Sequence, residues 1–86
     1  MPDRARGTRR GARMSNRERK TLMLIVRGYK AAAIAEQLGV TTNYVYAIAR
    51  LLRARFDAKT NAELISQAIA EGVISPDGEF LTVEET

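Results

Sequence analysis

Cysteine and histidine are absent from this chain. Without cysteine, neither a disulfide nor a thiolate metal site can form. Histidine is a common catalytic base and metal ligand, so its absence removes a second source of such chemistry. No paired carboxylates, nucleophile–base set or phosphate-binding loop can be assembled from the residues that are present. We therefore expect no enzyme activity, no catalytic residues, no metal and no cofactor.

Long hydrophobic runs are also missing. The run from Leu22 to Val26, like every other in the chain, is far too short to span a membrane. The basic N-terminus is not followed by the apolar segment of a signal peptide. The 86 residues, 45% of them hydrophobic, suffice for one small domain with a small core. These features predict a cytoplasmic protein that has no membrane contact.

Charge is distributed very unevenly along the chain. Residues 1–20 hold eight Lys and Arg against two acids, and residues 21–56 hold five against one. Residues 57–86 hold one Lys against seven acids. The basic two thirds would attract a polyanion, whereas the acidic end would not. This asymmetry favours a nucleic-acid partner over a merely solvated surface.

Local signals predict a succession of four helices. The first begins at Ser15, where Ser15 and Glu18 form the S-x-x-E pattern of a capping box. The last begins after Thr60, where Thr60 and Glu63 repeat that pattern. The expected helices cover approximately residues 15–27, 31–38, 42–55 and 61–71.

The two middle helices have the spacing of a helix-turn-helix. Ala35 leaves room for the second helix to cross closely, Gly39 suits a left-handed helix end, and Val45 packs back onto the core. Helical periodicity assigns one face of the second helix to the core: Val45, Ile48, Ala49 and Leu52. This shape is most often used to insert a helix into the DNA major groove.

Residues 14–74 resemble the DNA-binding domain of LuxR/GerE-type transcription regulators. Three segments carry the resemblance without a gap. Met14–Glu18 matches the family's Leu-Thr/Ser-x-Arg-Glu, residues 33–38 match Glu-Ile-Ala-x-x-Leu, and residues 41–45 match Ser-x-x-Thr-Val. The resemblance implies an all-α, four-helix domain that binds DNA, similar to members that stand alone without a receiver or ligand-binding domain.

The departures from the family pattern fall at polar positions. Tyr46 stands where the family usually has a DNA-contacting Lys, Ile48 where a His is common, and Asn61 where an Arg is usual. Because the core positions stay apolar, the expected fold is unaffected. The departures indicate that this chain reads DNA in its own way.

The exposed face of residues 42–55 holds the predicted base contacts, because the first turns of such a helix meet base edges. Asn43 can pair bidentately with adenine, and Arg50 can reach guanine or a phosphate. Lys30 precedes the helix over residues 31–38, where free amides favour a phosphate. The predicted DNA-binding residues are Thr42, Asn43, Tyr46, Ala47, Arg50, Lys30, Arg53, Arg10 and Arg13.

Several of these residues also have simpler interpretations. Tyr46 also suits packing against a neighbouring helix or a partner subunit, and Arg53 also suits a solvated charge at a helix end. Arg10 and Arg13 belong to residues 1–13, a basic arm expected to be disordered without a partner. That arm either contacts DNA, in a minor groove or along the backbone, or serves as a solubilising leader.

The helix after Thr60 carries an apolar stripe with two interpretations. The resemblance implies a homodimer contact through Leu64, Ile65, Ala68 and Ile69, and a dimer would bind paired half-sites. The alternative is that the stripe closes the core of the monomer. Beyond it, Ser75-Pro76-Asp77-Gly78 is a turn signal, so residues 75–86 form either a small hairpin or an acidic tail. The expected divisions are 1–13, 14–74 and 75–86.

Three functions remain open from the residues alone. The first is a sequence-specific transcription regulator, nucleoid-associated when bound to double-stranded DNA, that occupies an operator or touches RNA polymerase. The second is another DNA-binding role on the same shape, as in sigma-factor region four or phage terminase small subunits. The third is a protein-interaction module that has lost DNA binding.

Overall fold

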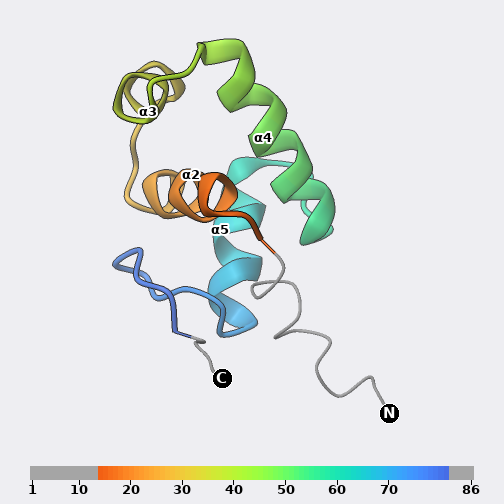
Figure 1. Cartoon of the computed structure of the whole chain (residues 1–86). Helices are drawn as coiled ribbons and strands as arrows, with labels where there is room; N and C mark the ends of the chain where they lie inside the picture. The colour runs from red at the N-terminus through yellow and green to blue at the C-terminus, as the bar shows by residue number, and fades with distance from the viewer. Residues whose placement is uncertain (1–13, 82–86) are drawn as a thin grey trace.

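A computed structural model of the chain describes residues 14–81, and these residues form an all-α fold (Figure 1). The four helices are α2 (Asn16–Val26), α3 (Ala31–Leu38), α4 (Thr42–Arg55) and α5 (Asn61–Ala70). They agree closely with the four predicted helices, and the described residues contain no strand. Helices α2 and α4 each contact all of the other helices, so these two form the centre of the bundle. None of these helices has the length and apolar character needed to cross a membrane.

Side-chain caps explain where the first and last helices begin. At α2 the capping box is complete: the Glu18 amide donates to Ser15 Oγ (3.1 Å) and the Ser15 amide donates to Glu18 Oε1 (2.9 Å). At α5 only one half forms as predicted, with the Glu63 amide donating to Thr60 Oγ1 (3.1 Å). The Glu63 carboxylate instead accepts from the Lys59 amide (2.7 Å), one residue earlier. Both helices therefore start where the sequence patterns predict.

The turn between α3 and α4 has the predicted helix-turn-helix geometry. Gly39 ends α3 in the left-handed conformation, with φ of +70°. The Val40 amide then donates to the Ala35 carbonyl (3.0 Å), which closes the turn. Thr41 begins α4 by accepting a hydrogen bond from the Tyr44 amide (3.0 Å). The roles predicted for Gly39 and Ala35 are confirmed, since Ala35 is only 5% exposed.

Replacing Gly39 by alanine is expected to lower the free energy of unfolding by about 1 kcal/mol, because a Cβ strains a backbone with positive φ. A Cβ at this position meets no atom within 4 Å, so the cost is conformational and not steric. Gly39→Asn is the matched control, because asparagine tolerates this conformation better. Urea denaturation followed by circular dichroism measures both, and equal stability of Gly39→Ala and the native chain would contradict the assignment.

The core draws on all four helices and on Met14, Phe56, Val73 and Ile74 outside them. The stripe predicted on α4 is confirmed, with Val45, Ile48, Ala49 and Leu52 all buried. Phe56, directly after α4, is the largest of the fully buried side chains. The other large side chains with almost no exposed surface are Leu22, Ile34, Leu52, Leu64 and Ile74.

Residues 73–81 fold back as a small hairpin. An antiparallel bridge joins Ile74 and Phe80, and the Ser75 amide donates to the Glu79 carbonyl (2.8 Å). The Leu81 amide donates to the Val73 carbonyl (3.0 Å). Of the two alternatives for this segment, the structure has the hairpin. The boundary expected after residue 74 therefore falls inside folded structure, and only residues 82–86 of the expected tail lie outside the described part.

Two arginines of the α2 region hold this hairpin. Arg27 donates from Nε to the Asp77 carbonyl (3.1 Å) and from Nη2 to the Gly78 carbonyl (3.3 Å). The Arg19 guanidinium lies over the Phe80 ring, 4.1 Å from its centroid. Arg27 and Arg19 already contact other residues of the chain, so we do not count them among the cations available to a partner.

Candidate nucleic-acid interface

The outward face of α4 brings most of the predicted base contacts together. A helix turns by about 100° per residue, so Asn43, Ala47 and Arg50 lie on one side, opposite the buried stripe. These three side chains are exposed, and the Tyr46 side chain beside them is 57% exposed. Thr42 is only half-buried at the start of the helix. Figure 1 shows α4 at the edge of the bundle, with no other labelled helix on its outer side.

The basic side chains of the interface differ in how far they are engaged. Arg55 pairs with Glu18 of α2 across 3.6 Å. Within residues 14–81, no carboxylate pairs with Arg50 or Lys30. An unpaired, exposed guanidinium on α4 keeps its full set of donors for a ligand. The outward face of α4 is thus both accessible and positively charged.

Arg53 is placed differently from the expectation. Its Nη1 donates to Asn61 Oδ1 (2.8 Å), which links the last turn of α4 to the first residue of α5. Asn61 is one of the departures from the LuxR/GerE pattern, and here it acts as the acceptor of this link. The bond favours a role for Arg53, which is half-buried, in orienting α5 against α4.

Lys30 occupies the N-cap position of α3, and its exposed side chain makes no capping hydrogen bond. The first amides of α3 are therefore left without a side-chain acceptor at this end, as a phosphate contact would require. Lys30 has the placement expected of it. Arg10 and Arg13 lie outside the described residues.

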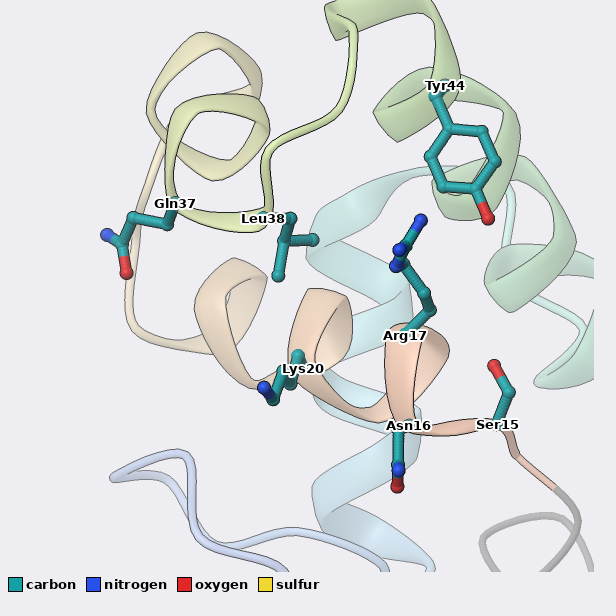
Figure 2. Close-up of a pocket in the computed structure, with 7 residues that line it drawn as sticks. All are labelled: Ser15, Asn16, Arg17, Lys20, Gln37, Leu38 and Tyr44. Carbon is teal, nitrogen blue, oxygen red and sulfur yellow. The ribbon is translucent and has the colours of Figure 1, made fainter.

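Sequence reasoning missed an open groove of about 630 Å³ between the start of α2, the end of α3 and the start of α4 (Figure 2). Arg17 and Lys20 of α2 both line it, one helical turn apart. The spacing of these two cations was visible in the sequence, but α2 was treated only as a core helix. The full lining is Ser15, Asn16, Arg17, Lys20, Gln37, Leu38 and Tyr44.

The predicted dimer contact on α5 needs a correction. Leu64 and Ala68 have no exposed surface, because they pack into the core of the monomer. They cannot also contact a second chain in this conformation, so we remove them from the predicted interface. Ile65 and Ile69 are only partly buried against the core, and they alone of the four keep surface for a partner.

Within residues 14–81, no three His, Cys, Asp or Glu side chains lie close enough together to hold a metal ion. Comparison with protein-family models, curated proteins and solved structures gives no match for this chain.

Proposed function

We propose that this chain is a sequence-specific, double-stranded DNA-binding regulator of transcription, with a LuxR/GerE-like helix-turn-helix that inserts α4 into the major groove. The observation that carries the proposal is the outward face of α4. There Asn43 and Arg50, two side chains able to read base edges, are exposed together opposite the buried stripe. Lys30 at the start of α3 supplies a phosphate contact beside them.

Selection of bound sequences from a random pool of DNA duplexes tests this proposal directly. We expect enrichment of one sequence motif, and an affinity for that motif that falls steeply with salt because phosphate contacts release counterions. Electrophoretic mobility shifts with the enriched and a scrambled duplex provide the measurement. Absence of any enriched motif, together with no binding of mixed duplexes at low salt, would overturn the proposal.

A homodimer is part of the same proposal, and it rests on the surface left on α5 by Ile65 and Ile69. A symmetric pair of chains would bind two half-sites, so the enriched motif would be palindromic. A regulator of this kind acts by occupying an operator or by touching RNA polymerase. A motif without internal symmetry would instead indicate that one chain binds alone.

One observation favours a second candidate function, a protein-interaction module. Leu51 and Tyr46 of α4 are 56% and 57% exposed, so this helix also offers apolar surface to a partner. Such a module would bind its partner with little dependence on salt and would not retain DNA. The salt titration of the previous experiment separates the two functions.

A further inference from the structure

The groove between α2, α3 and α4 joins two cations to an aromatic ring from another helix. Arg17 extends from α2 toward Tyr44 of α4, and its guanidinium carbon lies 5.6 Å from the centroid of the ring (Figure 2). Lys20 lies one turn further along α2 and lines the same groove. The contact with Tyr44 orients the Arg17 guanidinium over the groove, while its N–H groups remain able to donate.

The other groups around the groove are suited to an anion. Neutral polar side chains, including Ser15 and Gln37, complete the lining, and no carboxylate takes part in it. Glu18 and Glu36 adjoin lining residues in the sequence, but neither lines the groove, and Glu18 Oε1 is directed to the Ser15 amide and to Arg55. Two positive charges without a lining acid make the groove electropositive, and its open shape suits a segment of a chain more than a small enclosed ligand.

The groove also has the right position relative to the outward face of α4. A helix in the major groove, which is about 12 Å wide, has a sugar–phosphate backbone along each flank. Tyr44 is one residue, about 100° of helical rotation, from Asn43. The ring of Tyr44 and the Arg17 stacked on it therefore lie on a flank of α4, next to the face that carries Asn43.

We infer that this groove holds a segment of the DNA backbone that borders the major groove entered by α4, with Arg17 and Lys20 each neutralising a phosphate of it. This inference rests on the proposed DNA binding and adds a second contact on α2, outside the helix-turn-helix. Phosphate contacts position a protein on the duplex and carry no base preference. The groove thus fixes the orientation of α4, while Asn43 and Arg50 read the sequence.

The test measures the salt dependence of binding for Arg17→Gln and Lys20→Gln with duplexes of the selected and of scrambled sequence. Each loss of a phosphate contact is expected to reduce the slope of log affinity against log salt by about 0.9, which corresponds to about an eightfold loss at 0.1 M salt. The loss should be equal for both duplexes, so the preference between them stays unchanged. Arg17→Lys, which keeps the charge, should restore most of the slope.

Lys59→Gln is the matched control, because it removes one exposed charge that lies outside the groove. Its slope should equal that of the native chain, and circular dichroism should show the same helix content for all variants. Native slopes for both Arg17→Gln and Lys20→Gln, in a chain that binds DNA, would overturn the groove assignment and leave the proposed function intact. Failure of the native chain to bind any duplex at low salt would overturn both.

Discussion

Replacing Phe56 by alanine is expected to lower the free energy of unfolding by about 3–5 kcal/mol, the range seen for large-to-small changes in protein cores. The Phe56 side chain has no exposed surface and is the largest of the fully buried side chains. It lies where α4 ends and the chain turns toward α5, with its amide still donating to the Leu52 carbonyl (3.1 Å). Small domains are stable by only about 5–15 kcal/mol, so this single change removes a large part of the total.

Urea denaturation followed by circular dichroism measures this loss. Leu51→Ala is the matched control, because Leu51 is 56% exposed on the same helix and its truncation should change the stability by less than about 0.5 kcal/mol. If Phe56→Ala were as stable as Leu51→Ala, Phe56 would not be the centre of the α4–α5 junction.

The second large effect is expected for the double variant Asn43→Ala/Arg50→Ala. We expect at least about thirtyfold weaker binding to the selected duplex, because each good bidentate base contact discriminates by about 1–3 kcal/mol. Arg50→Ala alone should cost at least about tenfold. Binding to scrambled duplexes should change much less, since phosphate contacts supply most non-specific affinity. Fluorescence anisotropy titrations with both duplexes give the ratio.

Lys59→Ala/Gln67→Ala is the control for that experiment, because it also removes one cation and one amide from exposed positions, but away from the outward face of α4. Unaltered discrimination in Asn43→Ala/Arg50→Ala would show that this face does not read bases. The α2 groove variants make the complementary change, since they are expected to weaken both duplexes equally. The two sets of variants therefore separate base reading from phosphate binding.

Most of the helix boundaries were predictable because they depend on short-range bonds. Ser15 with Glu18, Thr41, and Gly39 each act within four residues of themselves, through caps and a left-handed helix end. The α4 stripe was predictable for a similar reason, since helical periodicity places its members on one face in any helical context. The outward face, with Asn43 and Arg50, follows from the same periodicity.

Other features were not predictable, because they depend on contacts between distant segments. The sequence pattern treated Leu64, Ile65, Ala68 and Ile69 as one stripe, yet the packing of α5 buries two of them completely and leaves two at the edge. Arg53 was predicted as a DNA contact or a solvated charge at a helix end, and its hydrogen bond to Asn61 of the next helix was not foreseen. Periodicity identifies the apolar face of a helix, but it does not show how much of that face a neighbouring helix covers.

By itself, the sequence determined the four helices, the helix-turn-helix between residues 31 and 55, and the residues that α4 turns outward, because caps and periodicity act locally. Only the tertiary structure decided which side chains meet across helices. It places Arg17 of α2 beside Tyr44 of α4, and it packs the hairpin of residues 73–81 against Arg27. Such contacts depend on the angles at which the helices cross. Those angles are set by the packing of entire buried helix faces, and not by any short stretch of residues.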